Sequence, residues 1–418
     1  MNFLPYHFRG LSPLSTLDIG APKTQVTPKS DYMKLLLVIN LHLHDRREAV
    51  RRGERPKLEY DALAEAVRAL PGGQADILDY DSVDREGGWF LWLIRRLFGY
   101  NAALVLLGHQ RSPQYNVILT ASESLALPLS LLLGLRRVRP RHVTTAYYLS
   151  NWRKALFLRL LGAHRWLDTI FTQSKEQYEA GLQLKIPESK LVLQESCGYF
   201  DAQFLSAETG KIVNEQQICS VGLMFRDYET LLAAVAELPF VKLKIDPSSP
   251  SANHPSTVDD VQTPPNVEIV RMKLGEVRFL YAESAAVVIP LRANSMGAGT
   301  TTMVEAMLMG KPVIITRSRD GTFAGRRDLI DGEHVIMVDT GDVPGWRKAI
   351  ERLMTDQELR RRIGAKGHEW ALQHTNREQW VEIFVEALRG PAGASPQSWT
   401  PGNPLKRRNL SDGCSSHP

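Results

Sequence analysis

The chain has 418 residues, more than one ordinary hydrophobic core contains, and this length corresponds to two or three domains. Its 43% hydrophobic and 23% charged residues are ordinary for a soluble globular protein, and its longest apolar runs reach only about half of the ~20 residues that a membrane span needs. Cys197, Cys219 and Cys414 are scattered, which excludes a disulfide framework and a zinc site and favours a reducing compartment.

Strands and helices alternate in the first half of the chain. Residues 1–30 and 390–418 are rich in Pro, Ser, Thr or Gly without periodicity, so we expect both to be disordered. Apolar runs predict strands at 35–40, 75–80, 117–120, 142–148 and 169–173. Helical spacing covers 60–70, and Ser174 with Gln177 predicts a capping box for a further helix.

A second alternating series begins at residue 218. Strands are predicted at 218–222, 241–245, 267–270, 285–291, 312–316 and 334–338. Helices are predicted at 228–238, near 274–284, between the Gly/Thr stretch and Gly310, and near 343–354, 356–373 and 376–389. Because alternating strands and helices imply parallel sheets, we expect an α/β protein with two Rossmann-like domains, at 31–205 and 206–389, that face each other across a cleft.

The segment 85–165 is strongly basic. It contains twelve Lys or Arg residues against Glu86 and Glu123, a local charge of +10, and aromatic residues are interleaved with them. Three interpretations remain open: solvated helix faces, a surface that meets anionic lipid headgroups, and a nucleic-acid site, for which no recognition motif is found.

The stretch NSMGAGTTTMVEAMLMGKPVIIT (294–316) follows a buried strand and predicts a loop, a helix and another strand. It is no Walker A motif, because Gly310-Lys311 is followed by Pro312. It is no complete dinucleotide fingerprint either, because Thr302 stands where the third glycine is needed. Free N–H groups at the start of this helix still favour an anion.

Two charged residues stand out beside this loop. Arg226 follows the strand that ends at Gly222, where a guanidinium is well placed to bind a diphosphate, although an ordinary surface charge is the alternative. Glu305 lies on the helix face of Thr301 and Thr302 among apolar neighbours, so its carboxylate needs hydrogen-bond donors such as ribose hydroxyls. Asp227 is expected to cap the next helix.

The motifs of the second series resemble the nucleotide-sugar half of GT-B glycosyltransferases of the retaining group 1, or family 4-like, type. The similar segments are EAM (305–307), GKPV (310–313), LIDG (329–332) and GD (341–342), preceded by a Gly-x-x-Asp-x-x-Phe linker at Gly198, Asp201 and Phe204. The resemblance covers 168–385 well and 34–167 only in architecture.

The resemblance implies a GT-B fold and a donor site in the second domain. Arg226 and Glu305 are the expected catalytic residues, with Arg226 on the diphosphate and Glu305 on the ribose. The donor site is expected to comprise Gly222, Arg226, Gly297, Gly299, Thr300, Thr301 and Glu305. No metal and no cofactor beyond the nucleotide-diphosphate sugar is expected.

The sequence also departs from the family. Gly297 occupies the place of a first glutamate that contacts the transferred sugar, and no lysine completes the phosphate clamp of Gly222 and Arg226. Tyr147 and Tyr148 occupy the region of a frequent histidine and are the expected acceptor-side residues. The first strand is followed by LHLHDRR rather than by a Gly-Gly loop.

The expected activity is transfer of a sugar to a glycan or lipid-linked acceptor with retention of anomeric configuration, in cell-surface glycan or glycolipid synthesis. The alternatives are a nucleotide-sugar epimerase on the same fold and a sugar-nucleotide-binding scaffold without turnover. The N-terminus lacks the pattern of a secretory signal, so a cytoplasmic protein is expected, peripheral on the inner face of an anionic membrane, with no nucleic-acid partner.

Overall fold

The computed structural model describes residues 25–26 and 32–390, except 150, 195–199, 207–212, 249–257, 259–261, 274, 294–296, 319–320, 322, 324–325 and 376. Nearly all of the two extensions predicted to be disordered lies outside these residues. Cys197, Gly198, Arg319 and Cys414 also lie outside them.

The first domain is built on a parallel six-stranded sheet of order β3-β2-β4-β6-β7-β8. The strands are β2 (Lys34–Val38), β3 (Gln74–Leu78), β4 (Val117–Thr120), β6 (Arg141–Ala146), β7 (Thr169–Thr172) and β8 (Leu191–Leu193). Because helices cover both faces of such a sheet, its central strands β2 and β4 are nearly continuous buried runs.

The helices of the first domain are α1 (His44–Arg51), α2 (Glu59–Arg68), α3 (Tyr80–Glu86), α4 (Gly88–Phe98), α5 (Tyr100–Arg111), α6 (Glu123–Gly134), α7 (Trp152–Leu160) and α8 (Lys175–Gln183). The strand β1 (Gln25–Val26) pairs with β5 (Val138–Arg139) apart from the main sheet. The short helix α9 (Ala202–Ser206) follows the region that connects the two domains.

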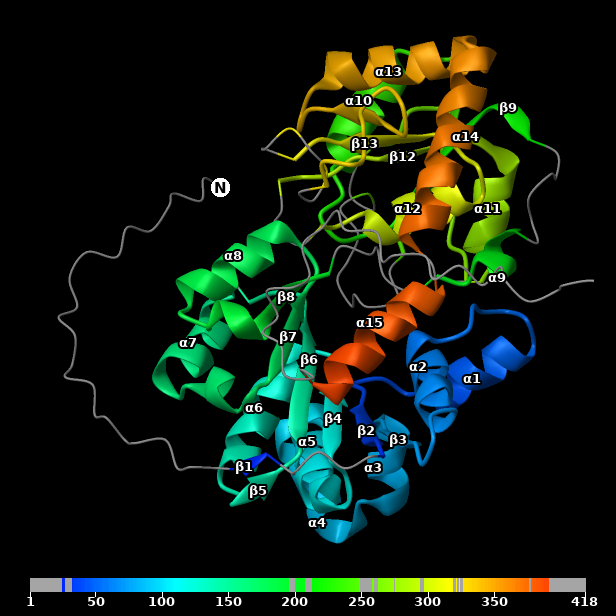
Figure 1. Cartoon of the computed structure of the whole chain (residues 1–418). Helices are drawn as coiled ribbons and strands as arrows, with labels where there is room; N and C mark the ends of the chain where they lie inside the picture. The colour runs from blue at the N-terminus through cyan, green and yellow to red at the C-terminus, as the bar shows by residue number, and fades with distance from the viewer. Residues whose placement is uncertain are drawn as a thin grey trace, which may run out of the picture.

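The second domain has a parallel sheet of order β11-β10-β9-β12-β13-β14. Its strands are β9 (Asn214–Val221), β10 (Lys242–Asp246), β11 (Val267–Ile269), β12 (Ser284–Ile289), β13 (Val313–Thr316) and β14 (Ile336–Val338). Its helices are α10 (Tyr228–Ala236), α11 (Val277–Glu283), α12 (Thr300–Leu308), α13 (Val343–Thr355) and α14 (Gln357–His374). The two parallel sheets confirm the predicted α/β architecture (Figure 1).

The last helix, α15 (Arg377–Arg389), leaves the second domain and packs on the first (Figure 1). Trp380, Phe384 and Leu388 belong to the same hydrophobic cluster as the strands of the first sheet, and the Phe384 ring stacks on Phe171 at 4.4 Å between centroids. The Arg141 Nε–H donates to the carbonyl of Ala387 at 2.9 Å. The final helix of the predicted segment 206–389 therefore completes the core of the first domain.

A histidine and a carboxylate connect the end of α14 to the loop before β14. His374 Nε2 lies 3.0 Å from Asp328 Oδ2, and the Trp370 indole N–H donates to the same oxygen at 2.8 Å. Burial is the largest single effect and opposes both charged forms, but the hydrogen bond between the two side chains, further hydrogen bonds and their opposite charges together outweigh it: the pKa of His374 is raised, and that of Asp328 is lowered to about 2.

These shifts predict how this contact depends on pH. The part due to His374 is fully present below its unfolded pKa of ~6.5 and is lost as pH rises through the higher folded value. The part due to Asp328 is present above ~3.8 and is lost as pH falls toward about 2. Because the pair is partly exposed, Asp328→Asn should lower Tm by only about 1–2 °C more at pH 5.5 than at pH 9, measured by calorimetry. An equal loss at both values would contradict the assigned pair.

Candidate active site

The carboxyl ends of β9 and β12 form the topological switch point of the second sheet. From β9 the chain continues to β10 and β11 on one side, and then returns to place β12 on the other side of β9. Crevices at such a point bind ligands in open α/β sheets. The Gly222 loop follows β9, and the Gly/Thr stretch follows β12, so both predicted donor-site segments lie at this edge.

The Arg226 side chain lies buried at this edge of the sheet. Its Nη2 donates to the Val221 carbonyl at 2.6 Å and to the Thr302 hydroxyl at 3.0 Å, and its Nη1 donates to the Met224 carbonyl at 3.3 Å. No carboxylate of the described residues forms an ion pair with it, and burial lowers its pKa. Arg226 is therefore not a surface charge. It is a buried cation whose guanidinium is already held in place by neutral hydrogen-bond acceptors.

The loop that carries Arg226 is fastened to the exit of β12. The Asp227 N–H donates to the Pro290 carbonyl at 3.0 Å, and the Arg292 N–H donates to the Phe225 carbonyl at 2.8 Å. Phe225 has a φ of +56°, a strained value for a bulky residue of the kind that often occurs at functional sites. The Asp227 carboxylate accepts the Thr230 N–H, so the predicted cap of α10 is confirmed.

Gly222 makes room for the guanidinium. Its φ is +112°, and a Cβ at this position would come within 2.6 Å of Arg226 Nη2. A larger residue here would be strained and would also displace the arginine. Gly222, which was predicted to bind the donor, is thus needed to leave room for the Arg226 side chain.

The helix α12 begins at a tight glycine turn. Gly297 and Gly299 have φ values of +63° and +91°, and a Cβ on Gly299 would lie 3.0 Å from the Ile289 side chain. The Thr300 hydroxyl donates to the Gly297 carbonyl at 2.7 Å. The N–H groups of Thr301 and the next residue have no acceptor among the described residues. Free N–H donors and a buried cation together form a site for an anion.

Glu305 lines a cavity of about 160 Å³ between the two domains. Thr301, one turn earlier on α12, lines the same cavity, whereas Thr302 turns away to Arg226. The Tyr281 hydroxyl donates to Glu305 Oε2 at 3.1 Å. Burial raises the pKa of Glu305 to about 7, and the hydrogen bond from Tyr281 partly opposes this rise. The carboxylate therefore has one protein donor and faces a space in which a ligand can supply more.

The opposite wall of the cavity comes from the first domain. Pro56, Lys57, Leu58 and Glu59, before and at the start of α2, line it, and burial raises the pKa of Glu59. The cavity therefore brings together two carboxylates, from α2 and α12, whose pKa values are both raised by burial. Neither Glu59 nor Tyr281 has a local sequence signal, because only the packing of the two domains brings them to this place.

Tyr147 and Tyr148 follow β6 on the first domain. Their N–H groups donate to the two oxygens of Glu123 at 3.0 and 3.2 Å, and Lys154 pairs with the same carboxylate. Tyr147 is also hydrogen-bonded to Tyr60, one residue after Glu59. Both tyrosines thus lie at the carboxyl edge of the first sheet, and Tyr147 connects to the cavity wall through Tyr60.

The turn after these tyrosines is also held by a side chain. Ser174 caps α8 as predicted, but the Gln177 side chain does not complete the capping box. Its Oε1 instead accepts the Leu149 N–H at 2.7 Å. A residue that looked like a local helix signal therefore fixes a loop 28 residues away in sequence.

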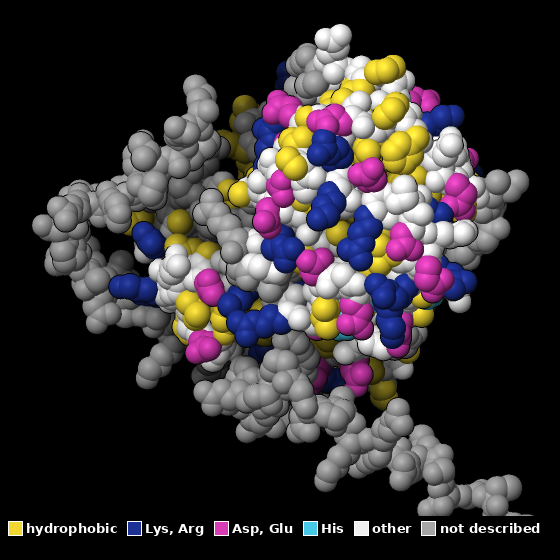
Figure 2. Space-filling model, turned by 90° about the horizontal axis from the view of Figure 1, so that it is seen from above, with side chains coloured by type: hydrophobic (Ala, Val, Ile, Leu, Met, Phe, Trp, Pro, Cys, Tyr) yellow, Lys and Arg dark blue, Asp and Glu magenta, His cyan; other side chains and the backbone are white. Residues whose placement is uncertain are grey.

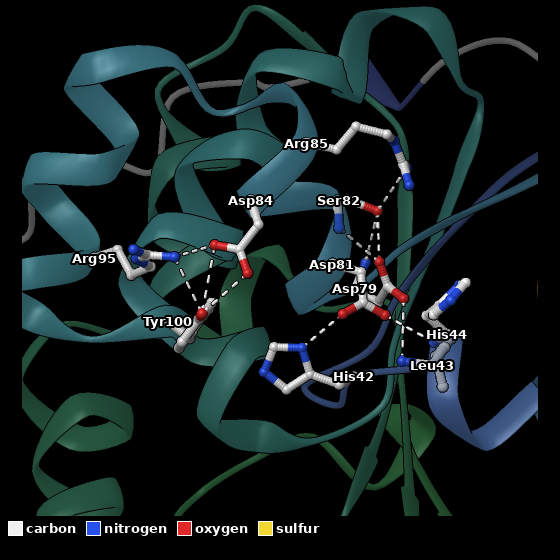
Figure 3. Close-up of polar contacts among 10 residues, drawn as sticks. All are labelled: His42, Leu43, His44, Asp79, Asp81, Ser82, Asp84, Arg85, Arg95 and Tyr100. Atoms are coloured by element: carbon white, nitrogen blue, oxygen red, sulfur yellow. Dashed lines mark hydrogen bonds and ion pairs between the residues drawn. The ribbon is translucent and has the colours of Figure 1, made fainter.

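The LHLHDRR segment after β2 forms a polar cluster with the residues after β3, as Figure 3 shows. His42 Nδ1 lies 2.6 Å from Asp81 Oδ1, and the His44 N–H donates to the other oxygen of Asp81 at 2.8 Å. The Arg95 guanidinium contacts Asp84 and the Tyr100 hydroxyl (Figure 3). The contacts of His42 and His44 hold this segment in place, where the family that the sequence resembles has a Gly-Gly loop.

A further arginine near this edge of the sheet has acidic partners. Arg317, after β13, pairs with Asp331 at 2.7 Å and with Asp339 at 3.1 Å, so it fastens its own loop. Within the described part of the chain, no group of three or more His, Cys, Asp or Glu side chains is arranged to hold a metal ion.

Comparison with known proteins agrees with the geometry of the second domain. Residues 217–356, from β9 to the end of α13, match the family model described as "Glycosyl transferases group 1". Over these residues the second domain is similar to group 1 glycosyltransferase domains. The chain is 29% identical over 172 residues to the lipopolysaccharide core biosynthesis glycosyltransferase LpsE of Rhizobium meliloti. That alignment covers 39% of this chain and 46% of LpsE, so it spans just under half of the relative.

The first and second domains together have the GT-B fold. Anabaena HepE, solved in complex with UDP-glucose, matches with a TM-score of 0.62 at 15% identity, over 85% of this chain and 99% of that one. The sucrose-phosphate synthase of Thermosynechococcus elongatus matches with a TM-score of 0.60 at 16% identity, over 85% and 98%. Because the sequence identity is so low, these structural similarities show the shared two-domain fold alone.

Proposed function

We propose that this protein transfers a sugar from a nucleotide-diphosphate sugar to a glycan or lipid-linked acceptor. The observation that carries the proposal is the buried Arg226, which has no acidic partner among the described residues, beside the free N–H groups at the start of α12. An uncompensated buried cation is costly, and a diphosphate would remove that cost. The group 1 match and the kinship with LpsE support the same reaction class.

In the proposed reaction the bond between the anomeric carbon and the diphosphate breaks, and an acceptor oxygen forms the new bond. The task of the protein is to stabilise charge that develops on the leaving diphosphate, which Arg226 and the N-terminus of α12 do by position alone. Glu305 holds the ribose hydroxyls. The resemblance to retaining group 1 enzymes supports retention of configuration, with attack on the face that the diphosphate leaves.

The test is a thermal-shift screen of nucleoside diphosphates and their sugars, followed by an assay for nucleoside diphosphate released with bacterial glycan or glycolipid acceptors. A ligand at 100 times its Kd stabilises the protein by ~2.7 kcal/mol, which is readily seen. We expect release that needs acceptor and persists in EDTA. Binding without release under any acceptor would indicate a scaffold, and loss in EDTA that a divalent ion restores would contradict a metal-free reaction.

One observation favours a second candidate, a nucleotide-sugar epimerase. Such an enzyme needs acid and base groups on both sides of the sugar, and Glu59 and Glu305 are carboxylates of raised pKa on opposite walls of one cavity. Interconversion of the free donor without acceptor would support the epimerase and exclude the transferase as the main activity.

We also propose that the acceptor is reached at an anionic membrane, at the inner face, through α4. This helix exposes Trp89 to 79% and Phe98 to 70%, with Trp92 and Leu97 also exposed. An exposed aromatic face of this kind suits the headgroup region of a bilayer. None of the described helices is long and apolar enough to cross a membrane.

The positive charge of segment 85–165 has a smaller effect than the number of its Lys and Arg residues suggests. Arg85 and Arg111 pair with Glu86, Arg95 with Asp84, Arg139 with Asp168 and Lys154 with Glu123. Arg96 on α4 stays exposed without an ion pair to a described residue. Figure 2 is seen from the side of the second domain, opposite α4 in Figure 1, and on that face acidic and basic side chains are interspersed. Membrane attraction therefore depends on the aromatic face of α4 more than on the arginine count.

The variant Trp89→Ala/Trp92→Ala should weaken co-sedimentation with anionic liposomes about tenfold or more, because two exposed aromatic side chains leave the interface. Arg96→Glu should weaken it less, by about 1 kcal/mol per lost charge, and mainly at low salt. Arg362→Glu, at an exposed site on α14, is the matched control and should have no effect. Wild-type protein that ignores both neutral and anionic vesicles would make a soluble acceptor the better choice.

A further inference from the structure

The cavity beside Glu305 is enclosed by both domains. Residues 56–59 line it from the first domain, α11 and α12 line it from the second, and α9 lines it from the region that connects them. The domains are in contact next to it, because a Cβ on Gly275 would come within 1.6 Å of the Glu54 carbonyl. A ligand that fills this cavity therefore touches both domains.

The size and the walls of the cavity suit a single ring. Its volume is about 160 Å³, and a cavity of about 150 Å³ accommodates one benzene molecule. Leu58, Phe204 and Val277 supply apolar surface on which the C–H face of a ring can pack. A sugar ring that Glu305 binds here is therefore within reach of the first domain as well.

Most of the charged side chains around the cavity already have partners. The Lys57 ammonium pairs with Glu65 at 2.6 Å. The Asp201 carboxylate accepts the N–H groups of Lys57 and Phe204, both at 3.1 Å. The Arg278 guanidinium donates to the Phe204 carbonyl at 3.0 Å. These groups complete the wall and are not the ones left to bind a ligand.

The carboxylates of Glu59 and Glu305 can still accept hydrogen bonds. Glu305 has the Tyr281 hydroxyl as its protein donor, and Glu59 has only its own backbone N–H among the described residues. The charge of Arg46 lowers the pKa of Glu59 and that of Asp61 raises it, but burial is the largest effect and raises the pKa of both cavity carboxylates. A ligand between them should therefore supply donors, and the hydroxyls of a sugar ring are neutral donors.

We propose that Glu59 binds a ribose hydroxyl of the donor nucleotide from the first domain, across the ring from Glu305. The inference rests on the proposed function, which assigns the ribose to Glu305. The donor is then held by both domains and not by the second alone. Glu59 becomes a donor-binding residue that also fixes how the first domain lies on the bound donor.

The test compares nucleoside diphosphates with and without a ribose hydroxyl by isothermal titration. The ligands are the nucleoside diphosphate that binds wild type best and its 2′-deoxy and 3′-deoxy forms. Glu59→Gln should weaken binding of the complete ligand about tenfold or more, because a carboxylate accepts a hydroxyl more strongly than an amide does. One deoxy form should bind this variant and wild type equally, since it lacks the hydroxyl that Glu59 binds, whereas the other should keep the tenfold difference.

The matched control is Glu48→Gln, in the same domain but outside the cavity, which should leave all three affinities unchanged. The Tm of each variant checks folding. The comparison of ligands on one variant does not depend on its stability, so a structural role of Glu59 would not produce the selective effect of one hydroxyl.

An unchanged affinity for the complete nucleoside diphosphate in Glu59→Gln would overturn the proposal. A loss seen only with a nucleotide sugar would also overturn it, because Glu59 would then bind the transferred sugar. An equal loss with all three ligands would show that Glu59 binds no ribose hydroxyl. If no nucleoside diphosphate binds wild type, the proposed function and this inference fail together, whereas the other outcomes reject the inference alone.

Discussion

Arg226→Lys is expected to lower turnover by about ten- to a hundredfold. A lysine keeps the charge but not the planar fork, and a charge-assisted hydrogen bond that tightens in the transition state is worth ~1.5–3 kcal/mol. Because Arg226 also binds the Val221 carbonyl and the Thr302 hydroxyl, Tm should fall as well. Steady-state kinetics with saturating donor separates the effect on kcat from the effect on KM.

A matched control exists in the same domain. Arg360 on α14 also donates to backbone carbonyls, those of Leu353 and Met354, and pairs with Glu215, but it belongs to none of the predicted site segments. Arg360→Lys should lower Tm and leave kcat unchanged. If the two lysine variants lose equal stability and neither loses turnover, Arg226 is only a structural brace.

Glu305→Gln should raise the Kd of the donor nucleotide about tenfold or more. The ionised carboxylate accepts hydroxyl donors more strongly than an amide of the same shape. With a pKa of about 7, wild-type affinity should rise between pH 6 and pH 8 and then level off, whereas the glutamine variant should show no such rise. Isothermal titration at several pH values measures both effects.

Tyr281→Phe gives an independent check on this carboxylate. The Tyr281 hydroxyl opposes the upward shift of the pKa of Glu305, so its loss should move the midpoint of the affinity profile to higher pH. The ionisation of Glu305 should affect folding stability in the opposite direction to donor affinity. A raised carboxyl pKa means that ionisation costs folding free energy above pH ~4.5, so Glu305→Gln should not lower Tm at pH 8. A glutamine variant with wild-type affinity and a lower Tm would make Glu305 structural.

The sequence predicted the second domain better than the first, and the reasons are local. Glycines mark element boundaries in the second series: Gly310 follows the end of α12, as predicted, and Gly299 immediately precedes its first residue, Thr300. In the first domain, 80–111 received no prediction although it forms α3, α4 and α5. The helix α4 has helical apolar spacing, but much of its apolar surface is exposed instead of packed on the core. The helix α6 is nearly all apolar and contains Pro128, which usually ends a helix.

The candidate site was predicted in position but not in its contacts. Arg226, Glu305 and the glycine turn lie together at one sheet edge, because carboxyl ends of parallel strands meet there. Their partners are distant in sequence: 76 residues separate Arg226 from Thr302, and 24 separate Tyr281 from Glu305. No periodicity encodes such pairs, so the buried state of Arg226 and the hydroxyl partner of Glu305 required the structure.

The return of α15 to the first domain makes that domain discontinuous along the chain. During synthesis its core stays incomplete until the ribosome has delivered Trp380, Phe384 and Leu388, so the inserted group 1 domain can finish folding before the domain that precedes it. The same layout decides where the gene can be cut. A truncation after α14 would expose Phe171 of β7, which Phe384 of α15 covers, whereas an exchange of 214–374 with the same segment of a relative would keep both parts of the first domain. Chimaeric proteins designed to use a different donor should therefore exchange the internal segment 214–374 and not the whole C-terminal half of the chain.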